Sequence, residues 1–140
     1  MKQTKSTKIS EVKRDWHLVD LKGKILGRIA SDIALLLMGK NKPNFVRNLD
    51  MGDFVVVINA KDFKVTGNKE KLKKYYRHSG YPGGFKSETL GDLRQRKPED
   101  VIIHAVSGML PQNRLKDKML SRLRVFEEEE HTFKDKFNKE

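Results

Sequence analysis

The sequence feature that most constrains the fold is the run Phe54-Val55-Val56-Val57-Ile58. Its residues are apolar and mostly β-branched, and Gly52-Asp53 and Asn59-Ala60 bound it on either side. A short, continuous apolar run of this kind is typical of a strand that is buried on both faces of a parallel sheet. The run therefore favours an α/β architecture.

Apolar spacing and turn residues predict the remaining elements. Ile29, Ile33, Leu36 and Leu37 have the spacing of an amphipathic helix, and Gly39 stands where a cap would end that helix. The other predicted elements are, in chain order, a strand at 16–20, a loop at 40–50, a short strand at 63–65, an extended or irregular basic segment at 69–86, a helix from Pro98 to Gly108 and a last helix at 113–123.

Length and charge limit the domain organisation and the class of partner. A chain of 140 residues is long enough for one domain with a hydrophobic core but too short for two. We predict a basic N-terminal tail at 1–14, a single domain at 15–126 and a charged C-terminal tail at 127–140. The net charge of +11 calls for an acidic partner, and nucleic acid is the commonest polyanion. A membrane surface is the alternative, although no apolar run approaches the ~20 residues that span a bilayer.

The sequence carries no strong signal for catalysis. The lack of Cys excludes disulfides, thiolate metal sites and cysteine nucleophiles. The four His residues are scattered, and the acid–His pairs spaced four residues apart have no evident third ligand for a metal. Asp50, Asp53 and Asp62 suit either acid–base catalysis or the capping of turns, and capping is favoured because no nucleophile accompanies them. We predict no enzyme activity, no metal, no cofactor and no small-molecule substrate.

The segment 71–86 carries the strongest signal for binding. Aromatic residues alternate there with Lys and Arg, and Gly80, Pro82, Gly83 and Gly84 lie among them. Aromatic rings stack on exposed bases, cationic groups contact phosphates, and glycines let a backbone approach closely. The alternative is a hairpin that packs in the core with a solvated basic face. We favour an RNA-docking loop, because glycines and prolines so closely spaced make a poor core.

A second basic surface is predicted on the last helix. Arg114, Lys118 and Arg122 are spaced four apart and so form one ridge, beside an apolar ridge that includes Leu115 and Met119. Successive members of the basic ridge rise about 6 Å along the helix axis, a spacing that suits contact with several phosphates. An ordinary amphipathic helix with a solvated basic face explains the same pattern.

Several motifs taken together resemble one protein family. They are Leu26-Gly27-Arg28-Ile29-Ala30-Ser31, Met51-Gly52-Asp53 before the buried run, Val65-Thr66-Gly67-Asn68-Lys69, Tyr75-Tyr76-Arg77-His78-Ser79-Gly80-Tyr81-Pro82-Gly83-Gly84, and the segment from Val106 to Pro111. In this order, over about residues 14 to 126, they resemble the bacterial-type large-subunit ribosomal protein L-thirteen family. The chain departs from the family pattern at Val46-Arg47, at Lys116-Asp117 and at 126–128.

The resemblance implies a three-layer α/β/α single domain with a mainly parallel four-stranded sheet. It also implies a structural constituent of the large ribosomal subunit that binds large-subunit rRNA, adjoins neighbouring ribosomal proteins and supports early subunit assembly and translation. The alternative function is a regulatory RNA- or mRNA-binding protein that acts off the ribosome. The expected location is the cytoplasm, with an organelle ribosome as the alternative.

The residues expected to bind RNA come from the basic loops, the tyrosine-rich segment and the turn before the last helix. They are Arg28, Lys40, Lys42, Arg47, Lys69, Lys73, Lys74, Tyr75, Tyr76, Arg77, His78, Ser79, Tyr81, Gly83, Gly84, Lys86, Met109, Pro111, Arg114, Lys118 and Arg122.

Overall fold

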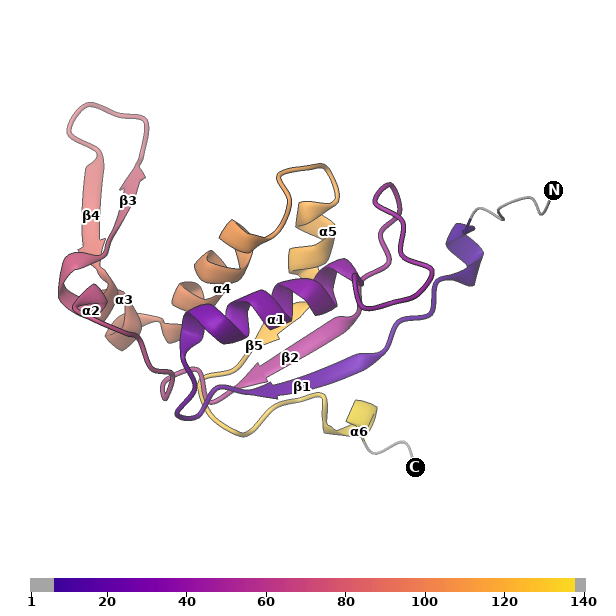
Figure 1. Ribbon diagram of the computed structural model, residues 1–140. Coiled ribbons are helices and arrows are strands. Elements are labelled where there is room, and N and C mark those ends of the chain that lie inside the picture. Colours follow the sequence, from indigo (N-terminus) through magenta and orange to yellow (C-terminus); the bar gives the residue numbers. More distant parts are fainter. Residues whose placement is uncertain (1–6, 138–140) are drawn as a thin grey trace.

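A computed structural model describes residues 7–137 of the chain and places a parallel sheet at its centre (Figure 1). The strands are β1 (Trp16–Asp20), β2 (Phe54–Ile58) and β5 (Leu123–Val125), in the order β1-β2-β5. Both neighbouring pairs are parallel, so that Trp16 lies opposite Phe54 and Val55 lies opposite Leu123. The strands predicted at 16–20 and 54–58 are confirmed, and so is the mixed α/β architecture with a mainly parallel sheet.

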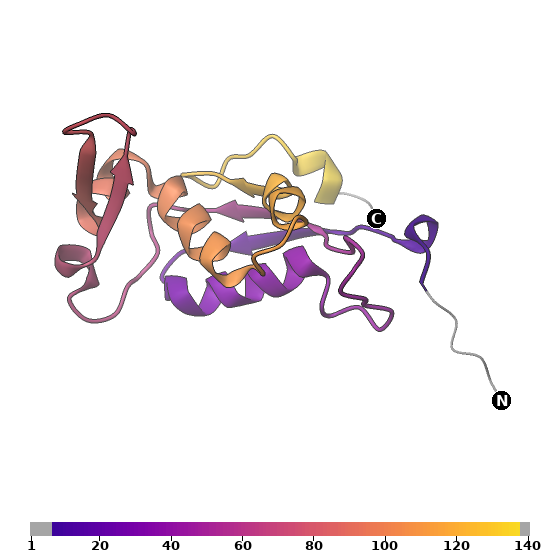
Figure 2. The same cartoon turned by 90° about the horizontal axis from the view of Figure 1, so that it is seen from above.

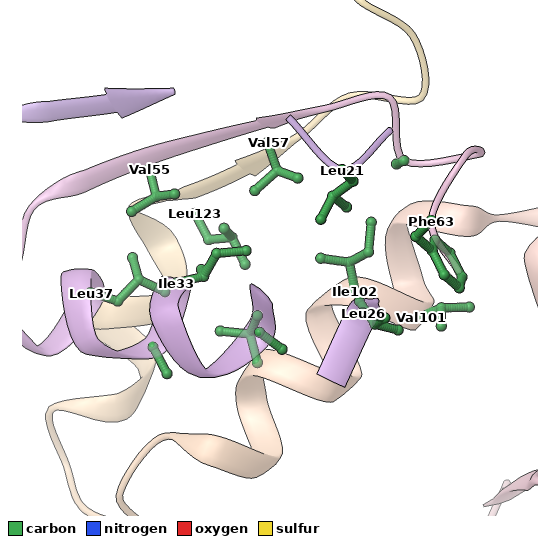
Figure 3. Close-up of a cluster of buried hydrophobic side chains, with 14 of the residues drawn as sticks. Leu21, Leu26, Ile33, Leu37, Val55, Val57, Phe63, Val101, Ile102 and Leu123 are labelled. Carbon is green, nitrogen blue, oxygen red and sulfur yellow. The ribbon is translucent and has the colours of Figure 1, made fainter. Parts of the chain in front are cut away.

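Three helices cover one face of this sheet: α1 (Leu26–Met38), α4 (Pro98–Met109) and α5 (Lys116–Ser121). Ile33 and Leu37 of α1, Val55 and Val57 of β2 and Ile102 of α4 meet in the hydrophobic core between helices and sheet (Figure 3). Each such side chain contributes about 1.5–3 kcal/mol by leaving water. The helix that we predicted to end at Gly39 does so, because Gly39 adopts the left-handed conformation at its C-cap.

The C-terminal segment covers the other face of the sheet, below it in Figure 1. Trp16 stacks on Phe54 with ring centroids 4.4 Å apart, and Phe133 lies 5.2 Å from the Trp16 ring. Phe137, at the end of the single-turn helix α6 (Lys134–Phe137), meets the same indole edge-on. Where the prediction placed a second layer of helices, the sheet is instead covered by a C-terminal segment that carries aromatic side chains and one short helix.

A separate hairpin projects from the sheet layer (Figure 2). Its strands β3 (Lys74–His78) and β4 (Phe85–Thr89) are antiparallel. Along the chain they follow the short helix α2 (Lys69–Leu72) and precede the short helix α3 (Leu90–Arg96). Thr89 caps α3, since its hydroxyl oxygen accepts a hydrogen bond from the Asp92 amide. The segment 69–86, predicted to be extended or irregular, is thus partly helical and partly a regular hairpin.

Two further predictions need correction within the described residues. A three-stranded sheet replaces the predicted four-stranded one, because the segment 63–65 makes only a single bridge, between Lys64 and Ile25. The last helix is shorter than predicted, since the chain leaves it after Ser121 to form β5. The N-terminal segment contains one 3-10 turn, at Ile9–Glu11, and Lys2 and Lys5 of the predicted basic tail lie outside the described residues.

Candidate nucleic-acid interface

The outer face of the β3–β4 hairpin presents aromatic rings to solvent. Tyr76 is 65% exposed and Phe85 is 59% exposed, and their rings stack on each other with centroids 5.6 Å apart. Tyr81, in the loop at the tip, is 76% exposed. Large aromatic side chains with so much exposed surface gain little for the fold, and they are suited to stacking on the bases of an RNA.

The loop at the tip of the hairpin has a defined geometry. Gly80 and Gly83 have φ values of 85° and 72°, a region that L-residues other than glycine rarely adopt. At Gly84 a Cβ atom would lie 2.0 Å from the Ser79 hydroxyl oxygen. Gly83 and Gly84 were predicted to allow close approach of RNA, but in this structure each already has a reason within the turn itself.

Among the described residues, the cations of the hairpin form no ion pairs. Within residues 7–137 no ion pair forms at Lys69, Lys73, Lys74, Arg77 or Lys86, although Lys73 lies over the Tyr75 ring at 5.4 Å. Two acids of this region, Glu70 and Glu88, instead form ion pairs with arginines of α3. Arg94 binds Glu70, and Arg96 binds both carboxylate oxygens of Glu88 at 3.0 and 2.7 Å. The Arg96 guanidinium thereby lowers the pKa of Glu88, and the hairpin keeps an unbalanced positive charge.

The inner face of the hairpin forms a groove against α3 and α4. This inner groove has a volume of about 710 Å³, and its walls include Tyr75, Arg77, Lys86, Arg96, Asp100 and His104. Tyr75 is the one predicted stacking residue that turns inward. It packs against the core with its ring centroid 5.3 Å from that of His104, and burial raises the pKa of its phenol.

A second hollow brings together predicted residues that are far apart in the sequence. Lys40 and Arg47, from the loop after α1, line one pocket of about 260 Å³ with Pro111 from the turn before α5. Phe45 and Asn113 also line this turn pocket. Figure 1 shows the loop after α1, the turn before α5 and the hairpin tip on the same side of the molecule.

Two predicted RNA contacts belong to a partly buried polar network, which we call the charged clamp: Arg14, Lys42, Asp50, Asp53 and Arg122. Arg122 is buried, and both of its terminal nitrogens donate to the Asp50 carboxylate at 2.6 Å. It also donates to the Leu37 carbonyl at 3.2 Å. The structure therefore corrects the prediction that Arg122 belongs to an exposed ridge.

Lys42 is likewise turned into the protein. Its ammonium group lies 2.6 Å from Asp53 and donates to the Lys13 and Met51 carbonyls at 2.5 and 2.9 Å. Asp53 also accepts from the amide of Asp15 at 3.1 Å and lies 3.0 Å from the His17 ring nitrogen. Burial opposes the charge of this carboxylate, but the hydrogen bonds from Lys42, His17 and Asp15 outweigh burial and lower its pKa.

The clamp explains the acids that we predicted to cap turns. Asp50 and Asp53 bind groups from distant segments, so their role is tertiary and not local capping. Gly52 permits this arrangement, because a Cβ there would lie 1.6 Å from the Leu37 carbonyl oxygen. Asp50 and Asp53, for which acid–base catalysis was the alternative, are each held by a cation of the clamp.

The remaining predicted residues are dispersed over the surface. Arg28 lies exposed on α1, and Lys118 lies exposed on α5. Arg114 precedes α5, so the three-membered helical ridge does not form. Met109, at the end of α4, is 42% exposed. The sequence interpretation did not predict that Arg96, Asp100 and His104 line the inner groove. The only signal in the sequence was that Asp100 and His104 are four residues apart on one helix.

The described residues give no geometry for a metal site or a membrane span. No group of three His, Cys, Asp or Glu side chains within 7–137 is placed to hold a metal ion. In the same range, every helix is too short or too polar to cross a bilayer.

Comparison with known proteins shows the family. The model of the family described as ribosomal protein L13 matches residues 14–132. A large ribosomal subunit protein uL13 of Dehalococcoides mccartyi is 57% identical over 91% of this chain and 90% of that protein. Proteins of the same name from Geobacter sulfurreducens and Clostridioides difficile are 53% and 52% identical, over 94% and 89% of this chain and 92% and 87% of theirs. The chain therefore belongs to the ribosomal protein L13 family, whose members are structural and non-enzymatic.

Proposed function

We propose that this protein is a structural constituent of the large ribosomal subunit that binds large-subunit rRNA and supports early subunit assembly and translation. The supporting relatives are bacterial proteins that are named as components of that subunit. The proposed location is the ribosome of the bacterial cytoplasm. Its proposed partners are large-subunit rRNA and neighbouring ribosomal proteins.

The observation that carries the proposal is the unbalanced charge and exposed aromatic surface of the β3–β4 hairpin. Arg77 and Lys86 lie directly opposite each other in the hairpin register. Like charges in this arrangement destabilise a hairpin, so a bound polyanion would remove a cost that the free protein carries. Tyr76, Phe85 and Tyr81 add rings on which unpaired bases can stack.

The proposed RNA-binding surface extends from the hairpin to the turn pocket. Lys40, Arg47 and Pro111 line that pocket, and Met109 and Arg114 lie exposed in the adjoining segment. Phosphate contacts at these positions would orient the protein, while contacts at the aromatic rings would select unpaired segments. Lys42 and Arg122 are left out of the proposed surface, because the charged clamp occupies them.

Sedimentation of the tagged protein from a cell lysate through a sucrose gradient tests the proposal. The protein is expected to travel with large subunits at moderate salt and to stay with them after a high-salt wash. The variant with Tyr76→Ala and Arg77→Ala is expected to be lost from the subunits at lower salt. A wild-type protein that remains at the top of the gradient would favour the alternative, a regulatory RNA- or mRNA-binding protein acting off the ribosome.

A further inference from the structure

The inner groove between the hairpin and helices α3 and α4 has features that nonspecific electrostatic attraction between cations and RNA phosphates does not explain. It is concave, whereas a surface that only tracks a phosphate backbone has no need of depth. Its volume of about 710 Å³ is within the range of small-ligand pockets, which begin at roughly 300 Å³. The groove is therefore large enough to enclose a single nucleotide.

The two walls of the groove differ in chemistry. On the hairpin wall, Arg77 and Lys86 are cross-strand neighbours that lie two pairs nearer the tip than Tyr75 and Glu88, and therefore on the same face of the hairpin. They form no ion pair within the described residues, so two adjacent cations are available to one phosphate. Nearer the base of the hairpin, the Tyr75 and His104 rings, tilted by 34° to each other, supply an aromatic surface.

The helical wall provides an acceptor without a hydrogen-bonding partner. Glu88 is held by Arg96 through two hydrogen bonds, and its carboxylate is thereby occupied. Asp100 acts on Arg96 through its charge, but its carboxylate accepts no hydrogen bond from any other residue in 7–137. An ionised carboxylate only accepts hydrogen bonds, and its two oxygens match two adjacent donors.

From these features we propose that the inner groove binds one unpaired guanine nucleotide of RNA, with its phosphate at Arg77 and Lys86 and its base edge at Asp100. Guanine is selected because its N1–H and N2–H₂ groups are adjacent donors, whereas adenine, cytosine and uracil each present an acceptor next to a donor. The aromatic surface of Tyr75 and His104 supports the base. This inference rests on the proposed RNA binding, and it specifies what one part of the surface recognises.

Binding of short RNAs by the full chain tests the inference. The probes are fluorescent heptamers of uridine in which the central base is guanine, inosine, adenine, cytosine or uracil, measured by anisotropy. The guanine heptamer is expected to bind about tenfold more tightly than the adenine, cytosine and uracil heptamers, since a good bidentate contact discriminates by about that much. The inosine heptamer, which lacks the N2 donor, is expected to fall between them.

Asp100→Asn and Glu99→Gln together test whether the preference for guanine comes from the groove or from the general charge of α4. Asp100→Asn is expected to remove the preference for guanine, so that the guanine and all-uridine heptamers bind alike. Glu99→Gln is the matched control, because it removes the same charge from the first turn of α4 at a residue that does not line the groove. It is expected to keep the preference. Arg77→Gln is expected to weaken all heptamers alike.

Other outcomes would overturn the inference. Equal binding of the heptamers, failure of the guanine heptamer to bind, or an Asp100→Asn variant that still prefers guanine would each do so. If the protein nevertheless travels with large subunits in the sucrose gradient and stays with them after the high-salt wash, the proposed function stands and only the guanine site fails. Competition by free guanosine monophosphate as effective as that by the guanine heptamer would show a free-nucleotide site, and would overturn the assignment to RNA.

Discussion

The charged clamp and the β3–β4 hairpin hold their cations in opposite environments. In the clamp, Arg122 and Lys42 are turned inward and bind Asp50 and Asp53 at 2.6 Å. In the hairpin, Arg77 and Lys86 stand side by side in solvent, and no described acid forms an ion pair with either. Both regions contribute to the same net charge of +11, yet only one of them has charge left for a partner.

The difference shows that the number of cations does not measure an RNA-binding surface. Arg122 was predicted to contact phosphate because its spacing from Lys118 places both on one helical ridge. Its partner Asp50 lies 72 residues away, a separation that no local pattern reveals. Cations of the clamp are expected to stabilise the fold, and cations of the hairpin to bind RNA.

The largest effect is expected from breaking the clamp. Asp50→Ala should lower the free energy of unfolding by about 3–5 kcal/mol, because it leaves the buried Arg122 guanidinium without its counter-ion. Urea denaturation monitored by the fluorescence of the single Trp measures this change. The double variant Asp50→Leu with Arg122→Met should recover much of the loss, since no buried charge remains. A single variant as stable as the wild type would show that the clamp does not support the fold.

The second effect concerns the hairpin and should appear in binding and not in folding. Tyr76→Ala is expected to weaken rRNA binding by about 1–3 kcal/mol, the usual contribution of one stacked base. Equilibrium binding to a large-subunit rRNA fragment measures it. Tyr75→Ala offers the contrast, because Tyr75 packs against the core and should also lower the unfolding temperature. An unchanged affinity of the Tyr76→Ala variant for rRNA would contradict the proposal that Tyr76 stacks on a base.

The third effect is the response of the clamp to acid. Asp53 has a pKa below its usual value of 3.8, so its contribution to stability is present above pH 3.8 and is lost as the pH falls through the lower, folded-state pKa. Asp53→Asn should therefore be less stable than the wild type at neutral pH. The gap should narrow as urea denaturation is repeated from about pH 5 down to about pH 2. A gap that stays constant with pH would mean that the charge of Asp53 plays no part.

The smallest effect is expected from hairpin cations on stability. Lys86→Gln should change the free energy of unfolding by less than about 0.5 kcal/mol, because its side chain is exposed and unpaired. A slight gain is expected, since the substitution relieves the repulsion between Lys86 and Arg77. A loss comparable to that of Asp50→Ala would remove the distinction between the two regions.

Local sequence signals predicted two strands of the sheet, β1 and β2, and the first helix. The run Phe54–Ile58 and the helix that ends at Gly39 were found at their observed positions, because burial on both faces and a left-handed cap leave clear patterns. β5 was missed, since its three residues are too few to show a period. The hairpin was considered only as an alternative that packs in the core, because its strands mix cations with aromatic rings and have no regular buried face.

The candidate site was predictable only in part. The exposed positions of Tyr76 and Tyr81 agree with the predicted docking loop, whereas Tyr75 turns inward because α4 lies behind its strand. The meeting of Lys40 and Arg47 with Pro111 depends on how α5 packs beside the end of α1. Such contacts arise from tertiary packing, and the spacing of residues along one element does not contain them.

The salt dependence of rRNA binding tests the central claim most directly. The affinity of the full chain for a large-subunit rRNA fragment is measured at several salt concentrations, for the wild type and for the variant with Lys74→Gln, Arg77→Gln and Lys86→Gln. Each lost phosphate contact should reduce the slope of log affinity against log salt by about 0.7–0.9. A shallower slope in a variant of unchanged stability is the predicted result, and an unchanged slope would contradict the assignment of RNA binding to the hairpin.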